Sequence, residues 1–229
     1  MTPRKIQVIR QKILRWYRTN KRDLPWRKTS DPYAILVSEV MLQQTQVLRV
    51  LPKYAEFIKA YPTVDALAHS SLADVLKLWS GLGYNRRAKY LKEMAEMVMN
   101  DYNGHIPNSY DELRKLPGIG DYTANAVLCF AFKKKAPAVD TNVRNVIERE
   151  LERDANYSLH SHEFADSHRI TQAMKQTPLS LQHVKNILME LMPTAHPDEF
   201  LHALMDYSAM TLSRPKRKSG STVPFTQSN

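Results

Sequence analysis

The sequence predicts an all-α protein, on the evidence of apolar spacing and of helix caps. Apolar residues recur at steps of three and four along most of the 229-residue chain, as at Ile6, Ile9 and Ile13. That is the period of a helix with one buried face. Several of these segments follow a capping residue, and no stretch alternates cleanly between apolar and polar residues as a half-buried strand does.

The helical segments can be placed in order along the chain. Helical spacing runs from Ile6 to Trp16 and again over residues 47–54. The stretch SSLADVLKLW opens with a serine cap, and NSYDELRKL opens with Ser109 and Glu112 in a capping-box arrangement. Asp198 is expected to cap the last segment, HPDEFLHALMDYSAM. Short polar or Gly/Pro-containing joints separate the segments, so we expect about ten helices.

The charge of the chain favours a polyanionic partner. There are 33 Lys and Arg residues against 23 Asp and Glu, a formal net charge of +10, and nucleic acid is the first candidate for such a protein. No apolar run reaches the roughly 18 residues of a membrane span, and the N-terminus lacks a signal-peptide core. The single cysteine, Cys129, excludes an internal disulfide framework and is interpreted as a buried thiol rather than a nucleophile. We therefore expect a cytoplasmic protein without membrane contact.

Two parts of the C-terminal half are harder to interpret. Residues 152–182 contain His160, His162 and His168, but their spacing matches no helical pair that faces one ion, so we predict no metal site. The tail, residues 213–229, has four basic residues and no acid. It is expected to be a disordered basic arm that adds phosphate contacts.

The stretch LRKLPGIGDYTANAVLCFAF, residues 113–132, indicates a tight joint between two helices. Two of only six glycines, Gly118 and Gly120, fall here directly after Pro117. Glycine permits positive φ and lets a ligand approach the backbone. A helix beginning at about Asp121 would add its free N–H groups, so the joint suits a DNA phosphate. A simple helix C-cap would need only one glycine.

About twenty residues later the chain reads APAVDTNVRNVIERE. Asp140 follows an apolar approach and precedes Thr141 and Asn142. From this pattern alone Asp140 is a good N-cap for a helix that begins near Thr141. A catalytic role is not indicated by these residues in isolation.

Several motifs together resemble the helix-hairpin-helix (HhH-GPD) DNA glycosylases. They are LPGIG, the VD that follows, and LPWRKTSDPYAILVSEVMLQQTQV. SEVMLQQTQV, LWSGLGY and MDYSAM look most like the MutY-type adenine DNA glycosylases, and the similarity covers about residues 8–150 and 184–212. The resemblance implies a two-lobed helical fold. Residues 1–29 and 136–212 would form one lobe, and residues 30–135 a helical barrel that carries the hairpin motif, residues 109–132.

The resemblance implies hydrolysis of the bond between a flipped base and its deoxyribose. Glu39 would protonate adenine N7, and Asp140 would stabilise or capture the sugar cation, a division of labour similar to that of glycoside hydrolases. The apolar neighbours of Glu39 would raise its pKa and keep it protonated. Tyr122 and Asn142 match family positions around the flipped nucleotide and Asp140, respectively. The alternative for Glu39 is an ordinary surface glutamate, and the alternative for Asp140 is a helix cap.

Further positions match family residues that touch the base or the duplex. Those expected in the base pocket are Arg22, Trp26, Arg27 and His202. Those expected to contact DNA are Leu42, Gln43, Gln44, Tyr84, Asn85, Pro117, Gly118, Ile119, Gly120 and Tyr122. Leu42 and Gln44 would enter the duplex as a wedge. Their alternatives are a helix core and a solvated face, and Trp26 could equally be core.

The chain also departs from the family. Relatives carry a four-cysteine iron–sulfur cluster whose first ligand position is Leu212 here, and Cys129 lies elsewhere, so no cluster or other cofactor is expected. The resemblance allows a monovalent cation at the hairpin. The NUDIX-like domain that helps relatives recognise 8-oxoguanine has no counterpart in this sequence. Asn85 replaces a tyrosine of many relatives, and His202 replaces Glu or Gln.

We therefore expect a monomeric base excision repair glycosylase that acts on double-stranded DNA with a mispaired or damaged base. The expected substrate is adenine opposite 8-oxoguanine or guanine. Tyr122 stands where lyases of the superfamily have a lysine, so the enzyme should be monofunctional. The alternatives are a thymine/uracil–guanine mismatch glycosylase and a catalytically inert hairpin module that only binds DNA.

Overall fold

The computed structural model describes residues 1–160 and 179–212, with side chains described for residues 1–151 and 179–212. The prediction of an all-α protein is confirmed, since every regular element in these ranges is a helix. The side chains of the three histidines considered for a metal, and the basic tail of residues 213–229, lie outside the described residues.

The chain forms a succession of mostly short helices. In order they are α1 (Pro3–Asn20), the 3₁₀ helix η1 (Pro25–Arg27), α2 (Pro32–Leu42), α3 (Val47–Ala60), α4 (Val64–Ala68), α5 (Leu72–Trp79), α6 (Arg86–Asp101), α7 (Tyr110–Lys115), α8 (Asp121–Phe130), α9 (Thr141–His160), α11 (Leu181–Leu191) and α12 (Pro197–Thr211).

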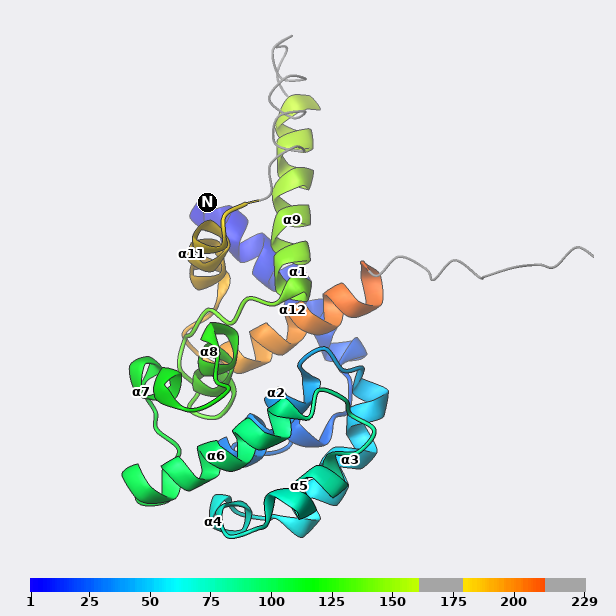
Figure 1. The fold of residues 1–229 in the computed structure, drawn as a ribbon. Coiled ribbons are helices and arrows are strands. Elements are labelled where there is room, and N and C mark those ends of the chain that lie inside the picture. The colour runs from blue at the N-terminus through cyan, green and yellow to red at the C-terminus, as the bar shows by residue number, and fades with distance from the viewer. Residues whose placement is uncertain (161–178, 213–229) are drawn as a thin grey trace, which may run out of the picture.

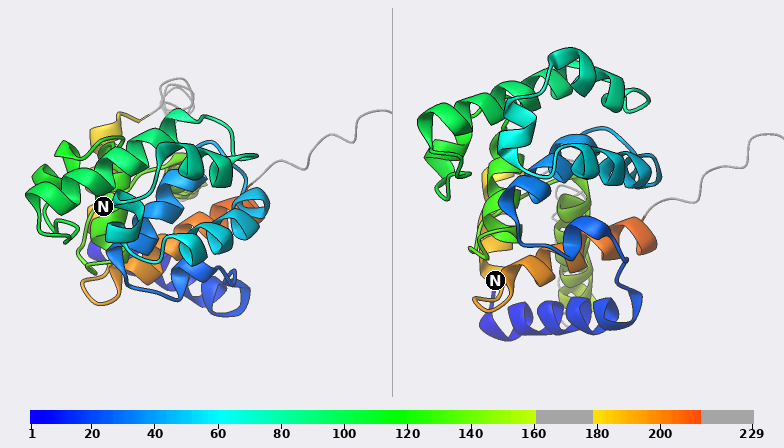
Figure 2. Two further views of the ribbon diagram at one scale, coloured as in Figure 1. Left: turned by 60° about the horizontal axis from the view of Figure 1, so that its bottom comes forward. Right: turned by 90° about the horizontal axis from the view of Figure 1, so that it is seen from below.

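The helices pack in two neighbourhoods. Helix α12 packs against α1 and α9, and α11 contacts the same two helices. Helix α2 packs against α3, α6 and α8, while α4 and α5 cover α6. Helices α1 and α6 are labelled in Figure 1; in the right-hand view of Figure 2, α1 lies at one end of the molecule and α6 at the other. Because α12 also touches α8, the two neighbourhoods meet beside α2. The lobe boundaries expected from the sequence remain a prediction.

Helix α2 is the central element, and its sequence explains why. Nearly every residue of PYAILVSEVML is apolar, so the helix has no polar face to give to solvent. Each residue from Tyr33 to Met41 is buried. Asp31 caps the helix by accepting a hydrogen bond from the backbone N–H of Tyr33 at 3.0 Å. Glu39 is therefore carried into the interior by its apolar neighbours.

Two of the predicted helix caps are present in the structure, and a third is not. Ser71 and Ser109 cap α5 and α7, and each hydroxyl accepts a hydrogen bond from the backbone N–H three residues later. Asp198 was expected to cap the last helix, and this prediction is wrong. Helix α12 begins at Pro197 after His196, whose φ is 54°, and the carboxylate of Asp198 instead accepts a 2.7 Å bond from Lys133 Nζ.

Within the described ranges, no helix combines the length and the apolar character that crossing a bilayer would require.

Candidate active site

A cavity of about 410 Å³ opens beside the carboxyl-terminal half of α2. It is lined from α2, the loop after it, η1 and the segment before it, α8, the start of α9, and α12. Among the lining residues are Arg22, Trp26, Arg27, Glu39, Leu42, Gln43, Gln44, Tyr122, Asp140, Asn142 and His202. The fold thus brings to one cavity residues that are up to 180 positions apart in sequence.

Glu39 is a buried carboxyl group whose pKa is raised into the neutral range. Its side chain lies at the cavity wall with 6% of the residue exposed. Burial raises the pKa of Glu39 from 4.5 to about 7, and the nearby charge of Asp140 adds to this, while a hydrogen bond from Tyr122 and the charge of Arg27 act in the opposite direction. Glu39 can therefore carry a proton near neutral pH and deliver it to a ligand in the cavity.

Tyr122 stays a phenol beside Glu39. Burial, together with the charges of Glu39 and Asp140, raises the pKa of Tyr122 well above its ordinary value. Tyr122 is the second residue of α8, directly after the hairpin, so the hairpin and the carboxyl of Glu39 are linked through one side chain.

Asp140 faces the same cavity from the start of α9. One carboxylate oxygen accepts a 2.7 Å hydrogen bond from the backbone N–H of Val143, and the other accepts a 2.9 Å bond from Asn142 Nδ2. The first contact is that of a helix N-cap. Asp140 therefore caps α9 and also presents a carboxylate to the cavity, so the cap interpretation and a site role do not exclude each other.

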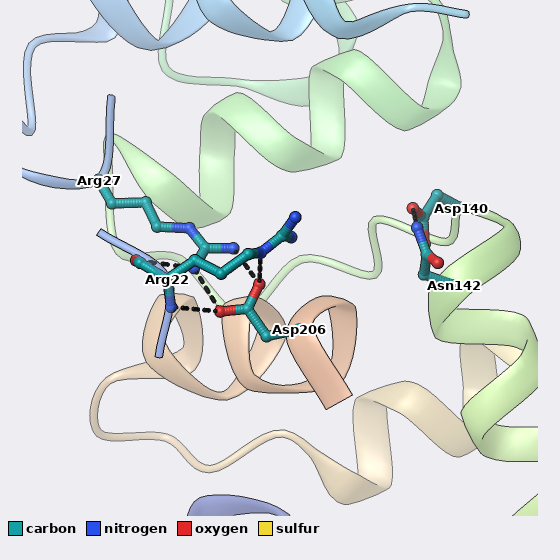
Figure 3. A network of polar contacts seen from close by, with 5 residues as sticks. All are labelled: Arg22, Arg27, Asp140, Asn142 and Asp206. Carbon is teal, nitrogen blue, oxygen red and sulfur yellow. Dashed lines mark hydrogen bonds and ion pairs between the residues drawn. The ribbon is translucent and has the colours of Figure 1, made fainter. Parts of the chain in front are cut away.

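A buried ion-pair network forms the opposite wall (Figure 3). Asp206 of α12 is completely buried. Its oxygens accept 2.7 and 2.8 Å bonds from Arg27, a 2.6 Å bond from Arg22 Nε and a 3.0 Å bond from the Arg22 backbone N–H. Burial acts to raise the pKa of Asp206, but the hydrogen bonds and charge of Arg27 outweigh it and the pKa is lowered. The carboxylate is thus held ionised, and it fixes both guanidinium groups at the cavity.

The remaining base-pocket candidates, Trp26 and His202, line the same cavity. The ring of His202 stacks on Phe130, with centroids 4.1 Å apart and planes 9° from parallel. Burial, and next the charge of Arg27, lower the pKa of His202 well below its ordinary value, so the imidazole is neutral at physiological pH. Trp26 is buried edge-on against Tyr54 and also lines the cavity. It therefore belongs to both the core and the cavity wall.

The hairpin lies outside this cavity and has its own geometry. The Ile119 N–H donates to the Leu116 carbonyl at 3.2 Å, and Gly118 has φ +76°. Pro in the second position and Gly in the third are typical of a type II β-turn. Gly120 has φ −84° and needs no special conformation, and the nearest atom to a Cβ built there would be Arg114 Nη1 at 3.9 Å.

The acid at the start of α8, Asp121, is paired with a lysine. Asp121 accepts a 2.6 Å bond from Lys185 of α11 and a 2.8 Å bond from the Tyr110 hydroxyl. The carbonyl of Ile119 in the hairpin accepts a 2.7 Å bond from Arg114. A cation at this turn remains a prediction.

Of the two predicted wedge residues, Leu42 is half-buried, whereas Gln44 is exposed beside a second hollow of about 260 Å³. It is lined by Gln43, Gln44, Tyr84, Arg86, Arg87, Tyr90 and Gly118. Gln43 and Gln44 border both cavities, and Leu42 borders the first. Tyr84 is 64% exposed, and Asn85 is exposed at the start of α6. The other predicted DNA contacts do not line the first cavity. They are Tyr84, Asn85, Pro117, Gly118, Ile119 and Gly120.

Three residues of this region were not singled out from the sequence. Asp206 had a signal, because it is the one acid in the apolar stretch FLHALMDYSAM. Arg87 is buried beneath the wedge loop, but nothing in NRR distinguishes it from the exposed Arg86. Phe130 is one aromatic residue among several, and only the fold places it under His202.

A metal centre finds no support in the described part of the chain. No group of three or more His, Cys, Asp or Glu side chains there is arranged to hold an ion. An iron–sulfur cluster needs four thiolates, whereas the sequence has only Cys129, which is buried and whose pKa burial raises to about 12. These residues do not fit such a cluster.

Comparison with known proteins places this geometry in context. Residues 37–164 match the family model of the HhH-GPD superfamily base excision DNA repair proteins. The chain is 49% identical over 138 residues to an adenine DNA glycosylase of Mycobacterium tuberculosis, which covers 60% of this chain and 45% of that protein. It is 35% identical to the adenine DNA glycosylase of Homo sapiens over 96% of this chain and 38% of the human protein.

A solved structure extends the similarity over nearly the whole fold. The structure of a thermostable thymine-DNA glycosylase superposes with a TM-score of 0.77 at 31% identity, over 93% of this chain and 90% of that one. By contrast, the chain spans less than half the length of the two curated adenine glycosylases above.

Proposed function

Because the chain belongs to the HhH-GPD superfamily of base excision DNA repair proteins, we propose that it is a DNA N-glycosylase that removes a mispaired adenine from duplex DNA. The observation that carries the proposal is the pair of unlike carboxyl groups in one cavity. Glu39 is buried and has a pKa of about 7, whereas Asp140 is held by hydrogen bonds from a helix terminus and from Asn142. Glu39 can donate a proton, while the Asp140 carboxyl group is oriented toward the same cavity.

This pairing suits the departure of adenine. Adenine leaves readily only when its ring is protonated, and the sugar then develops positive charge. Glu39 would supply the proton at N7, and Asp140 would face the sugar. The neutral His202 and the fixed guanidinium of Arg27 would contact the flipped base, whose entry requires a cavity of this kind.

The hairpin and the basic surface would hold the duplex. The backbone of the hairpin and the first turn of α8 would offer N–H groups to one phosphate. The residues at the edge of the cavity, Leu42 and Gln44, would occupy the gap that the flipped base leaves. These contacts bind the DNA backbone and fill the gap in the base stack without selecting a base. The cavity would therefore determine which base is removed.

We further propose that the enzyme does not cleave the strand. A lyase needs an amine that can attack the sugar, and none of the residues that line the described cavity is a lysine. Tyr122 stands beside Glu39 with its phenol protonated. The abasic product should therefore leave with both strands intact.

A second candidate is a thymine– or uracil–guanine mismatch glycosylase. It is favoured by the similarity to a thymine-DNA glycosylase over nearly the full length of both chains. It is also favoured by His202, because the sequence at that position departs from the Glu or Gln of the adenine enzymes it resembles. The acid at Glu39 favours adenine, because thymine and uracil have no N7 to protonate.

The deciding experiment compares four duplexes, with A·8-oxoG, A·G, T·G and U·G pairs, each treated with alkali after incubation. We expect release of adenine, no nick before alkali, and little covalent complex on borohydride reduction. Glu39→Gln should abolish release without abolishing binding. Release confined to thymine or uracil would replace the first candidate with the second. Binding without release from any duplex would indicate the inert module.

A further inference from the structure

Arg87 is a buried arginine whose contacts converge from two loops. Its residue is 8% exposed, and it makes six hydrogen bonds. Nη1 donates to the carbonyls of Val40, Met41 and Gln43 at 2.9, 2.9 and 2.7 Å. Nη2 donates to Thr45 Oγ1 at 3.0 Å and to the carbonyls of Leu82 and Gly83 at 3.1 and 3.0 Å.

The first set of acceptors is the end of α2 and the loop that follows it. The last carbonyls of a helix have no intrahelical partner, and a cation there also opposes the negative end of the helix dipole. At the end of α2, Arg87 supplies both hydrogen-bond donors for these carbonyls and a positive charge. Because Glu39 precedes Val40 directly, the same contacts fix the helix turn that carries the proton donor.

The second set joins this loop to the one that carries Tyr84. Both loops contain a residue in the left-handed region, Gln44 with φ 55° and Tyr84 with φ 50°. Such conformations are unfavourable for residues other than glycine and persist only where the surroundings hold them. The guanidinium also lies over the rings of Trp79 and Tyr84, at 5.4 and 5.5 Å from their centroids.

We propose that Arg87 is a positioning residue that locks the loop of Gln43–Thr45, the loop of Leu82–Tyr84 and the end of α2 into one rigid unit. The inference rests on the proposed function in that both loops are taken to face DNA. As one unit, the two loops would enter the duplex together and in register with Glu39. Only a planar group with several N–H donors can bridge so many carbonyls, so lysine cannot replace it.

The test uses Arg87→Lys with Arg10→Lys as the matched control. Arg10 also bonds backbone carbonyls at a helix end, through Nε to Leu191 and Nη2 to Glu190, but it lies on α1. In single-turnover assays on the duplex from which the unmodified protein releases a base, Arg87→Lys should slow base release by about tenfold to a hundredfold. Its affinity for an undamaged duplex should change by no more than about twofold. Arg10→Lys should change neither quantity.

Hydrogen exchange supplies a readout that does not depend on activity. The backbone N–H of Thr45 donates to the Leu42 carbonyl, and that of Leu82 donates to the Trp79 carbonyl. In Arg87→Lys these two amides should lose protection together, and in Arg10→Lys they should not. Loss confined to one loop, or equal slowing of base release in both variants, would overturn the inference. If the unmodified protein released no base, the proposed function would fail, while the exchange result would still decide whether Arg87 couples the loops.

A milder variant covers the case in which Arg87→Lys does not fold. Thr45→Val removes one acceptor of Arg87 and the contact of the Thr45 hydroxyl with the Leu82 carbonyl. It should show the same joint loss of protection and a smaller fall in the rate of base release. Unchanged exchange in both loops would contradict the inference.

Discussion

Glu39 destabilises the folded protein whenever it ionises. The folded protein holds its pKa at about 7, whereas an unfolded chain leaves it near its ordinary value of 4.5. Between these values the folded state binds more protons, so stability falls as pH rises through the window, by on the order of 3 kcal/mol in total. Glu39→Gln should therefore stabilise the protein by up to about that amount at pH 8 and by almost nothing at pH 4.

Denaturant unfolding of the unmodified protein and Glu39→Gln at the two pH values measures this difference. The ionisation of Glu39 should also affect catalysis. The rate of base release should decrease as pH rises above about 7, because the proton donor is lost. An equal change in stability at both pH values would show that Glu39 does not titrate in this window.

Asp140 has two roles that two substitutions can separate. Asparagine is as good an N-cap as aspartate, so Asp140→Asn should keep the bond to the Val143 N–H and the stability of α9 while slowing base release by at least roughly 10²-fold. Asp140→Ala should lose the activity and, in addition, about 1 kcal/mol of stability. Thermal unfolding and single-turnover assays measure the two effects. Full activity in Asp140→Asn would reduce Asp140 to a helix cap.

At the scale of elements, the hairpin contains two glycines with different requirements. A Cβ at Gly118 would lie 2.8 Å from Tyr90 Cβ in a backbone with φ +76°. Gly118→Ala should therefore destabilise the protein by about 1–3 kcal/mol. Gly120→Ala meets neither problem, so its stability should change by less than about 0.5 kcal/mol. It should still weaken DNA binding, because the methyl group stands where a phosphate would approach.

Thermal unfolding and fluorescence anisotropy with a labelled duplex distinguish these effects. The pair is informative because each variant adds the same methyl group to the same turn. If Gly120→Ala bound DNA as tightly as the unmodified protein, the phosphate would not approach the hairpin at that residue.

The elements that the sequence predicted well are those specified locally. The caps at Ser71 and Ser109 and the hairpin depend on residues within a few positions of one another. Asp198 was assigned wrongly because Pro197 begins the helix and Lys133, from another element, takes the carboxylate. The pairing of Asp206 with Arg22 and Arg27 could not be predicted from spacing, since it joins residues about 180 positions apart. Family resemblance placed Glu39 and Asp140 in one site, and the sequence also predicted the apolar neighbours of Glu39 and the N-cap at Asp140. The hydrogen bond of Tyr122 with Glu39 and the nearby charge of Arg27 came only from the fold.

At the scale of the whole molecule, the net charge of +10 should make DNA binding strongly salt-dependent. Each neutralised phosphate contributes roughly −0.9 to the slope of log K against log salt. Deletion of residues 213–229 removes four basic side chains. It should therefore flatten that slope and lower the affinity for matched and mismatched duplexes equally. Binding titrations over a range of salt concentrations measure both. A loss restricted to one mismatch would mean that the tail reads bases.

The solitary, fully buried thiol of Cys129 also makes this chain convenient for site-specific labelling. Its pKa of about 12 leaves almost no thiolate to react with maleimides at neutral pH. A cysteine introduced at an exposed position would therefore be modified selectively, without first removing the native one. Tyr84→Cys, on a residue that is 64% exposed, would carry a fluorophore or spin label at the edge of the loop. Its signal would report in real time when that loop leaves water for the duplex.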